Sequence, residues 1–314
     1  MRGALPHFSG VITAPALFRL AMRDDVESRV VARGETRHGP FTKLTAGPSR
    51  WTVLVNGVNL HVPEADALLQ RSHFVPQARL DDVMVSYATR GGGVGPHVDS
   101  YDVFLLQGSG RRRWTIGGKS WVAQPGDMIY LPPEVRHDGV ALEPCFTYSI
   151  GFRAPRGAEL GAAFLDWLHE RGLPDERYRD PDLRPARRPG AIPRQMLRYT
   201  VSYLSRIRWA RADAERFLGE FLTEPKAHVV FRPQPARRLH SRSVVRLDPR
   251  TRLLYGGACF FINGDSLEMS GAGARVLREL ADRRMIQGSR LAHGALGGLL
   301  SAWQKAGYVH FERA

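Results

Sequence analysis

Residues 95–114 read GPHVDSYDVFLLQGSGRRRW, and residues 125–137 read PGDMIYLPPEVRH. The first stretch holds a histidine and an aspartate two positions apart, His97 and Asp99, and the second ends in His137. Two histidines and one carboxylate are the usual ligand set of non-haem Fe(II), and they leave metal positions open for a co-substrate and oxygen. The two stretches together therefore predict a metal site of the kind found in oxygenases.

Short strands separated by turns surround these stretches. Glycine runs punctuate the region, as in Gly91-Gly92-Gly93 and Gly117-Gly118, and β-branched or aromatic residues fill the segments between them. We expect strands at residues 51–55, 81–87, 102–106, 113–116, 127–131 and 147–152. Many short strands at close spacing predict an all-β barrel or jelly roll over residues 51–152.

The two ligand-type residues of the first stretch have the same parity. On a strand, His97 and Asp99 would point to one face, and that face would be the barrel interior. The proline pair after residue 131 predicts that a strand ends just before His137, so that this histidine can meet the other two. The alternative is that His97 is a surface turn residue and His137 a capping residue.

Three consecutive arginines, residues 111–113, follow the first ligand pair. A 2-oxoglutarate oxygenase needs a cation for the distal carboxylate of its co-substrate, and a planar guanidinium holds a carboxylate with two hydrogen bonds. Arg111 and Arg113 share one face of a strand and Arg112 points to the other. Only one of these faces can be the interior, and a solvated basic run is the more common fate of such residues.

The chain outside this region has a helical texture. We expect a helix at residues 15–21, with Thr13 as its N-cap, and another around residues 160–168. A loop rich in proline, arginine and aspartate follows at 174–194, and a long helical region at 196–222 is broken near 209–213. The remainder mixes strands at 260–262 and 307–311 with helices around 270–284 and 292–306.

The composition is that of a globular protein with a strong positive charge. The 314 residues carry a formal net charge of +14, and 41 of the 45 basic residues are arginine. Codon usage in a GC-rich genome explains such a skew, and so does affinity for nucleic acid or a ribonucleoprotein surface. Only Cys145 and Cys259 are present, and no apolar run could span a membrane, so we expect a reducing cytoplasmic location.

Several segments resemble the bacterial JmjC (cupin-type) ribosomal oxygenases, and within them most closely the arginine hydroxylases of 50S ribosomal protein L16. These segments are HVDSYDVF (97–104), QGSGRRRW (107–114), PGDMIYLPP (125–133), HDG (137–139) and YSIGFRAP (148–155), together with DVESR (25–29). The resemblance covers most of residues 20–155 and, more loosely, the whole chain. Members of the family carry a longer segment where residues 117–121 bridge two strands here.

The resemblance implies an α+β architecture in three parts. These are a JmjC double-stranded β-helix (cupin) catalytic domain over residues 1–155, a helical dimerisation region over 156–228 and a C-terminal winged-helix-like domain over 229–314. It implies Fe(II) on His97, Asp99 and His137 as the catalytic centre, and 2-oxoglutarate bound by Arg112 and, more weakly, Ser149. The implied reaction is 2-oxoglutarate- and O₂-dependent hydroxylation of an arginine side chain of L16 by a homodimer, with succinate and CO₂ as co-products.

Two other functions remain open at this point. One is a different cupin-type oxygenase, such as a ribosomal histidine hydroxylase or a demethylase. The other is a non-catalytic cupin with a DNA-binding winged helix, because a fold alone does not carry a function.

The binding surfaces are the least determined part. Tyr101, Asp102 and Asp138 could contact a cationic substrate or could serve structural hydrogen bonds, and residues 24–29 form an acidic patch or a helix end with internal ion pairs. Seven arginines suggest a basic surface near ribosomal protein or RNA, or a solvated linker: Arg232, Arg237, Arg238, Arg242, Arg246, Arg250 and Arg252. Direct nucleic-acid binding stays undecided.

Overall fold

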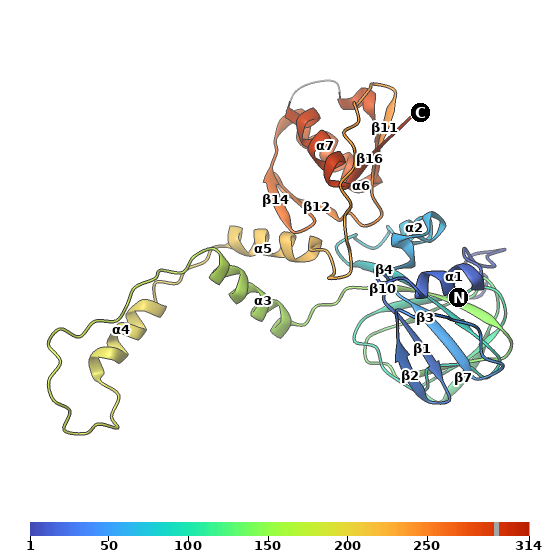
Figure 1. Cartoon of the computed structure of the whole chain (residues 1–314), viewed down its shortest axis with the longest axis horizontal. Coiled ribbons are helices and arrows are strands. Elements are labelled where there is room, and N and C mark those ends of the chain that lie inside the picture. Colours follow the sequence, from blue (N-terminus) through green and yellow to red (C-terminus); the bar gives the residue numbers. More distant parts are fainter. Residues whose placement is uncertain (292–294, 314) are drawn as a thin grey trace.

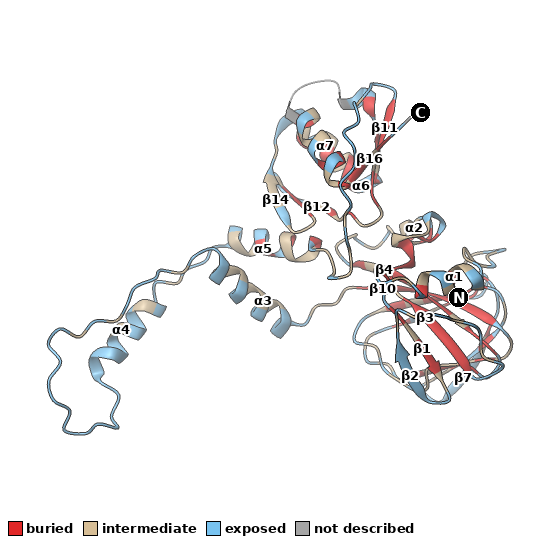
Figure 2. Ribbon diagram, viewed as in Figure 1, coloured by how far each residue is buried: buried red, intermediate tan, exposed pale blue. Residues whose placement is uncertain are grey.

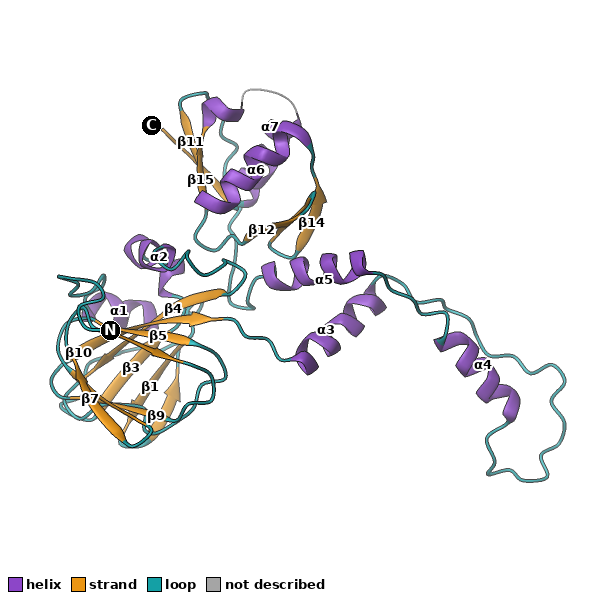
Figure 3. Ribbon diagram, turned by 180° about the vertical axis from the view of Figure 1, so that it is seen from behind, coloured by secondary structure: helices purple, strands orange, loops and turns teal. Residues whose placement is uncertain are grey.

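The computed structural model describes residues 1–291 and 295–313. Three parts follow one another along the chain: a β-sandwich, an extended helical segment and a C-terminal domain of strands and helices (Figure 1). The view from behind shows the same separation, with the helical segment reaching away from both other parts (Figure 3). Over the described residues, no helix combines the length and the apolar character needed to cross a membrane.

Ten strands build the N-terminal part. They form a seven-stranded sheet in the order β2-β1-β3-β4-β10-β5-β8 and a three-stranded sheet in the order β7-β6-β9. All neighbours are antiparallel. The strands are β1 (Ser28–Ala32), β2 (Glu35–His38), β3 (Trp51–Val55), β4 (Leu80–Ala88), β5 (Val103–Gln107), β6 (Arg112–Ile116), β7 (Lys119–Ala123), β8 (Met128–Leu131), β9 (His137–Ala141) and β10 (Cys145–Phe152).

The side chains of the central strands point alternately to two faces of the large sheet, one in the hydrophobic core and one toward the small sheet. Val53 and Val55 of β3 and Val85 of β4 enter a hydrophobic core that is closed by α1 (Ala14–Ala21), η1 (Val58–Leu60) and α2 (Pro63–Gln70). The residues between them point to the space between the two sheets, because side chains alternate along a strand. The fold thereby leaves one face of the sheet free to carry polar side chains.

The helical segment consists of α3 (Gly157–Glu170), α4 (Arg194–Leu204) and α5 (Arg211–Thr223). An aromatic cluster joins α3 to α5, with ring centroids of Phe164 and Trp167 at 5.2 and 6.0 Å from that of Phe217. Helix α4 lies beyond this cluster and is almost wholly exposed (Figure 2). The helical region therefore breaks between Leu204 and Arg211, within a few residues of the predicted position.

Two three-stranded sheets and two helices form the C-terminal domain. The sheets have the orders β15-β11-β16 and β12-β13-β14. The elements are β11 (Ser243–Leu247), β12 (Leu253–Gly256), β13 (Cys259–Ile262), β14 (Asp265–Glu268), α6 (Gly271–Arg283), β15 (Met285–Gln287), η2 (Gly288–Leu291), α7 (Ala295–Ala306) and β16 (Val309–Arg313). The first three residues of the predicted helix 292–306 lie outside the described residues.

Helix α5 packs against two parts of the molecule, helix α3 and the C-terminal domain. It contacts α3, and it also packs on β13 so closely that a Cβ at Gly219 would lie 2.4 Å from the ring of Phe261. The domain boundaries at 155/156 and 228/229 stay predictions.

Two expectations for the β-sandwich are wrong in detail. His97 and Asp99 do not lie on a strand but in the loop between β4 and β5, where His97 makes one isolated antiparallel bridge to His137. The positive φ angles of Gly91 and Gly95 turn the chain away from β4 before the histidine. Residues 117–121, which were expected only to bridge two strands, contain the start of an additional strand: Gly117 and Gly118, both with positive φ, form a two-residue turn from β6 to β7.

Candidate active site

A cavity lies between the two sheets and is lined by their inward-facing residues. The large sheet contributes alternate positions, such as Thr52 and Leu54 of β3 and Asp82, Met84 and Ser86 of β4. The small sheet contributes Arg112 and Trp114 of β6 and His137 of β9, and the loop after β4 contributes His97 and Asp99. The predicted ligand residues therefore meet in one cavity.

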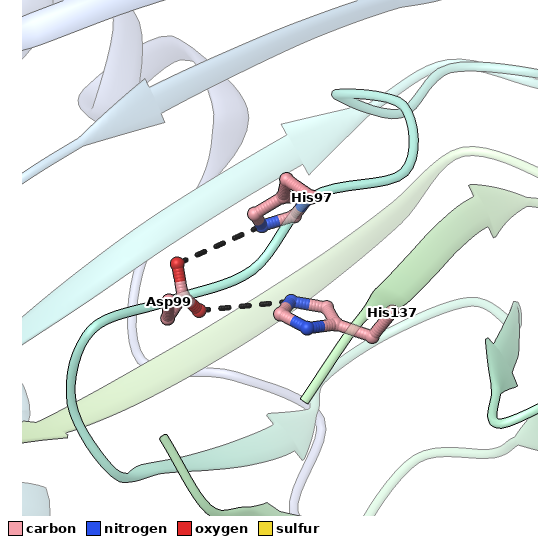
Figure 4. Close-up of side chains that lie close together, drawn as sticks. All are labelled: His97, Asp99 and His137. Atoms are coloured by element: carbon pink, nitrogen blue, oxygen red, sulfur yellow. Dashed lines mark ion pairs between the residues drawn. The ribbon is translucent and has the colours of Figure 1, made fainter. Parts of the chain in front are cut away.

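The three ligand-type side chains converge on a common point (Figure 4). Asp99 lies between the histidines, with its Oδ1 3.8 Å from His97 Nε2 and its Oδ2 3.6 Å from His137 Nε2. One atom from each residue lies within 4.8 Å of the other two, a spacing that suits three ligands of one metal ion. The side chain of His137 is 3% exposed, whereas those of His97 and Asp99 are 37% and 29% exposed, so the site is open on one side.

Backbone carbonyls fix the orientation of both imidazoles. His97 Nδ1 lies 2.9 Å from the oxygen of Gly95, and His137 Nδ1 lies 2.9 Å from the oxygen of Val135. A carbonyl only accepts, so each Nδ1 carries a proton, and Nε2 is the atom that each imidazole can offer to a metal ion. Both Nε2 atoms face Asp99, which is the arrangement that a metal ion requires of histidine ligands.

Backbone hydrogen bonds hold the loop of the first two ligands against β9. The amides of His97 and His137 each donate to the carbonyl of the other, at 3.0 and 2.9 Å, and Glu134 N donates to Asp99 O at 2.8 Å. Earlier in the loop, a Cβ at Gly93 would lie 2.5 Å from the carbonyl oxygen of Gly139. The ligands are thus positioned by closely apposed backbone rather than by a regular strand pair.

The arginine triplet divides between the interior and the surface. Arg112 is 5% exposed and lines the cavity, whereas Arg113 is exposed and Arg111 pairs with Glu143 on the surface at 3.0 Å. Among the residues that the structure describes, the buried Nε and Nη2 atoms of Arg112 have no hydrogen-bond partner. A buried guanidinium with free donors costs free energy unless an acceptor occupies the cavity.

Hydroxyl groups line the same cavity. Ser149 of β10 is buried and lines the cavity, together with Thr147 and Thr52. The Oγ1 of Thr52 is a further buried atom without a partner in the described part of the chain. The cavity therefore offers a cation and several hydroxyls on the side away from solvent.

Asp82 and Tyr101 also belong to the cavity wall, and of the two only Tyr101 was a candidate from the sequence. Asp82 accepts a hydrogen bond from Lys226 Nζ at 3.3 Å. Burial raises the pKa of Asp82, and the Lys226 charge works against this rise. Burial, followed by the charge of Asp99, raises the pKa of Tyr101 to about 12. Only tertiary proximity to Lys226, far away in the sequence, distinguishes Asp82 from an ordinary strand residue.

The other acidic candidates have different surroundings. Asp102 is engaged by Arg79 at 2.8 Å and by the Tyr130 hydroxyl at 2.6 Å. Asp138 on β9 is absent from the cavity wall. Near the N-terminus Asp25 pairs with Arg23 just after α1, so this segment is a helix end with an internal ion pair, and only Arg29 from it reaches the cavity.

Family models match two regions of the chain. The model described as the JmjC domain matches residues 67–120 and 118–160, and the model described as the ROXA-like winged helix matches residues 206–310. The predicted combination of a cupin-type core, helices and a C-terminal winged helix is confirmed. The winged-helix match begins at residue 206 and so includes α5.

Curated relatives and solved structures agree with these matches. The chain is 36% identical over 256 residues to the ribosomal protein uL16 3-hydroxylase of Escherichia coli K12, covering 72% of this chain and 68% of that protein. It is 34% identical over 196 residues to a probable ribosomal oxygenase of Haemophilus influenzae, covering 51% of this chain and 47% of that protein.

The structure superimposes on the ribosomal oxygenase YcfD from E. coli with a TM-score of 0.85 and 30% identity, over 99% of this chain and 93% of that one. Complexes of YcfD with cobalt and succinic acid and with cobalt and 2-oxoglutarate match with TM-scores of 0.86 and 0.85, at 29% and 30% identity. Both matches cover 99% of this chain and 94% of the other.

Proposed function

Because the chain belongs to the family of ribosomal oxygenases with a JmjC domain, we propose that it hydroxylates an arginine side chain of ribosomal protein uL16. It is an Fe(II)- and 2-oxoglutarate-dependent oxygenase. The observation that carries the proposal is the combination, in one cavity, of the His97–Asp99–His137 set with the unpaired guanidinium of Arg112.

The three ligand residues suit Fe(II). Two imidazoles that are held by their Nδ1 atoms and turn Nε2 toward a common point, together with one carboxylate, make the facial set that non-haem iron enzymes use. In the proposal, His97, Asp99 and His137 hold the metal. Fe(II) with bound 2-oxoglutarate would supply the oxidising chemistry, in which O₂ is consumed, the co-substrate becomes succinate and CO₂, and one oxygen atom enters a substrate C–H bond.

Arg112 suits the distal carboxylate of 2-oxoglutarate. Its two free donors, Nε and Nη2, match the paired acceptors of a carboxylate, and its burial strengthens such a pair. Ser149 is a weaker second contact on the adjacent wall. Val103 and Leu105 of β5 line the same cavity and would keep water away from the bound co-substrate.

Asp82 and Tyr101 suit the arginine side chain of the substrate. A guanidinium that enters the cavity needs a carboxylate or an aromatic face, and these two residues offer both beside the ligand set. Tyr101 also lines a second, more open pocket with Phe221 and Lys226, so it stands where a peptide would pass into the cavity. Asp82 and Tyr101 thus take the role that Asp102 and Asp138 held among the sequence-based candidates.

Homodimerisation through the helical segment is part of the proposal. One face of α4 carries Leu197, Val201 and Leu204, which are 59%, 59% and 55% exposed in the single chain, and Leu165 of α3 is 66% exposed. Positions 197, 201 and 204 follow helical spacing, so they form one apolar stripe. A second copy of the chain would cover this stripe, and sedimentation of Val201→Asp against the unaltered chain tests it. The cytoplasm, where ribosomal proteins are made, is the location we propose.

Mass spectrometry of the product tests the function. Incubation with uL16, Fe(II) and 2-oxoglutarate should add the mass of one oxygen atom to an arginine of uL16 and release one succinate per product. A gain of mass on a histidine, or a loss of methyl groups, would instead identify another cupin-type oxygenase. Tight duplex DNA binding without any turnover would favour the non-catalytic alternative.

The His137→Ala variant supplies the matching test of the metal site. It should lose turnover and bind Fe(II) more weakly, because one of three ligands is gone. Its far-UV circular dichroism should stay that of the parent chain. Full activity in this variant would remove His137 from the metal.

A further inference from the structure

An acid-free, arginine-rich stretch forms the far end of the helical segment. Between Leu183 and Ala212 the chain has eight arginines and no aspartate or glutamate. The stretch runs from the loop before α4, through α4, to the start of α5, and it projects away from the two other parts of the molecule (Figure 1). We call residues 183–211 the arginine arm.

Hydrogen bonds and an ion pair anchor helix α4 of the arm to residues 174–176. Glu176 receives both Nη atoms of Arg206 at 2.8 Å, and its backbone carbonyl accepts a hydrogen bond from the Tyr199 hydroxyl at 2.5 Å. The Tyr203 hydroxyl donates to the carbonyl of Pro174 at 2.6 Å. These contacts tie α4, which carries Arg194 and Arg198, to residues 174–176 of the preceding loop. Arg184, Arg187 and Arg188 lie in the part of the loop between these two anchored segments.

The charges of the arm are not compensated within the chain. Five arginines are exposed and make no ion pair or side-chain hydrogen bond with any residue in the ranges 1–291 and 295–313: Arg184, Arg187, Arg188, Arg194 and Arg198. Arg194 and Arg198 even stand four positions apart on α4, where like charges destabilise a helix. An external polyanion would relieve this repulsion.

Three of the seven C-terminal arginines that the sequence suggested are paired within the chain. Arg246 pairs with Glu312, Arg250 with Asp248, and Arg252 with Asp81 in the interface to β4. The other four, Arg232, Arg237, Arg238 and Arg242, are exposed and have no ion pair within residues 1–291 and 295–313. The arm, with five such arginines, is therefore one of two regions of free positive charge, and it is the one that also exposes a tryptophan.

We propose that the arginine arm is an RNA-binding surface, which goes beyond the hydroxylation proposed above. Guanidinium groups bind phosphate oxygens through two donors, and aromatic side chains that stand among them can stack on unpaired bases. Trp209 lies between Arg208 and Arg211 in the sequence, at the base of the arm. Its ring contacts that of Phe164 of α3, with the centroids 5.4 Å apart, but it stays 60% exposed and so offers a stacking face. An acidic protein could pair with the arginines of the arm but would have no bases to stack on the ring of Trp209.

Salt-dependent binding of RNA tests the arm. The probe is a fluorescein-labelled, mixed-sequence single-stranded RNA of about 20 nucleotides, titrated with the full chain at several salt concentrations between about 50 and 200 mM. For single strands, log K falls with log salt by about 0.7 for each phosphate neutralised, so five arginines give a slope near about −3.5. The variant Arg184→Gln/Arg187→Gln/Arg188→Gln should bind at least about tenfold more weakly at about 50 mM salt, with a slope that is smaller by about 2.

A matched variant controls for net charge. Arg37→Gln/Arg71→Gln/Arg275→Gln removes three exposed arginines outside the arm and should bind RNA like the parent chain. Both triple variants should keep the parent's succinate release with a uL16 peptide, because none of the six residues lines the catalytic cavity. An equal loss in both variants, or no loss in either, overturns the proposal.

Two competitors distinguish the class of partner. Polyglutamate and anionic vesicles, each at the same concentration of negative charge as the RNA, should displace the probe at least about tenfold less well, since neither offers bases for stacking. Equal displacement by polyglutamate would replace RNA by an acidic protein, and equal displacement by vesicles would replace it by a membrane surface.

Discussion

At the scale of single residues, a substitution of Arg112 can distinguish a role in co-substrate binding from a role in stability. A buried guanidinium with free donors lowers the stability of the empty protein by about 1–3 kcal/mol. We expect Arg112→Met to melt at or above the temperature of the parent chain, while its KM for 2-oxoglutarate rises about 30-fold or more, as befits the loss of a two-bond charged contact. Succinate release and thermal melting, each with and without 2-oxoglutarate, measure the two effects.

Arg113→Met is the control, because Arg113 is exposed on the same strand. It should leave both quantities unchanged. A destabilised Arg112→Met protein with an unaltered KM would make Arg112 a structural residue and would leave the co-substrate carboxylate without a partner in the cavity.

The residue types and spacings of the site were accessible from the sequence, but the contacts were not. The spacing of His97, Asp99 and His137 indicated the metal set, and the parity of the arginine triplet limited the inward candidates. The parity argument for His97 and Asp99 assumed a strand, whereas an extended loop produces the same alternation. Asp82 could be identified as a site residue only from the fold, because its partner Lys226 lies on the segment after α5.

At the scale of elements, the close contact between the ligand loop and β9 should set metal affinity. Gly93→Ala would place a methyl group 2.5 Å from the Gly139 carbonyl oxygen. Because the atom in the way belongs to the backbone of β9, this clash can be relieved only if the ligand loop moves away from β9. A shift of about 1 Å at the ligands is enough to reduce turnover about 100-fold. We expect the Fe(II) concentration for half-maximal activity to rise and kcat to fall by at least about tenfold, both read from succinate release.

Gly161→Ala serves as the comparison. Gly161 lies in α3, where nothing from the rest of the molecule comes within 4 Å of an added methyl group, so alanine should raise helix stability by about 0.5–1 kcal/mol. Activity should not change in this variant. Normal iron dependence in Gly93→Ala would mean that the loop tolerates the displacement.

Glu220 of α5 joins three elements. It accepts hydrogen bonds from Trp167 of α3 at 2.7 Å and from Ser266 of β14 at 2.6 Å, and it pairs with Arg171 and Arg216. Burial by itself raises the pKa of Glu220, but these hydrogen bonds outweigh it and lower the pKa to about 2. The folded pKa is thus below the unfolded value of 4.5, so the stabilisation is present above pH 4.5 and lost as the pH falls towards 2.

Glu220→Gln should therefore lose about 2 kcal/mol of unfolding free energy at pH 7, and its difference from the parent chain should vanish near pH 2. Urea unfolding at a series of pH values measures this. Glu215→Gln removes an exposed pair with Arg211 and should cost less than about 0.5 kcal/mol at any pH. A pH-independent loss in Glu220→Gln would point to packing instead of charge.

Local patterns predicted the helices other than α2 and about half of the described strands, but the turns between the elements could be recognised only from the backbone geometry. Residues 117–121 were expected only to bridge two strands, whereas Gly117 and Gly118 both adopt positive φ and β7 begins directly after them. Likewise, the apolar spacing of α5 does not reveal two partners, and only the contact of Gly219 with Phe261 does. Pairings of this kind depend on distant residues, which a single sequence does not specify.

At the scale of the whole molecule, one charge cluster ties the C-terminal domain to the catalytic strand β4. Lys226 donates to Asp81 at 2.9 Å and to Asp82 at 3.3 Å, Arg252 donates to the backbone oxygens of Leu80 and Asp81, and Arg153 pairs with Asp81. Burial lowers the pKa of Lys226, but the charges of Asp82 and Asp81 reverse this and raise it. Since Asp82 also lines the cavity, the cluster links the position of the C-terminal domain to the site.

Lys226→Met would leave two half-buried carboxylates without this cation. Removal of one partner of a fully buried pair costs about 3 kcal/mol, and because the Lys226 side chain is 36% exposed we expect a smaller loss of about 1–2 kcal/mol. The folded pKa of Lys226 lies above its unfolded value of 10.5, so its contribution is complete below pH 10.5 and is lost as the pH rises beyond it. Urea unfolding at neutral pH should show the loss, and limited proteolysis should cut the segment between α5 and β11 faster.

The exposed Lys305→Met is the matched control and should behave like the parent chain. In a double-mutant cycle, Lys226→Met with Asp81→Asn should cost at least about 0.5 kcal/mol less than the sum of the single changes. Strict additivity would show that Lys226 and Asp81 act separately, and the charged contact of the C-terminal domain with β4 would then be that of Arg252.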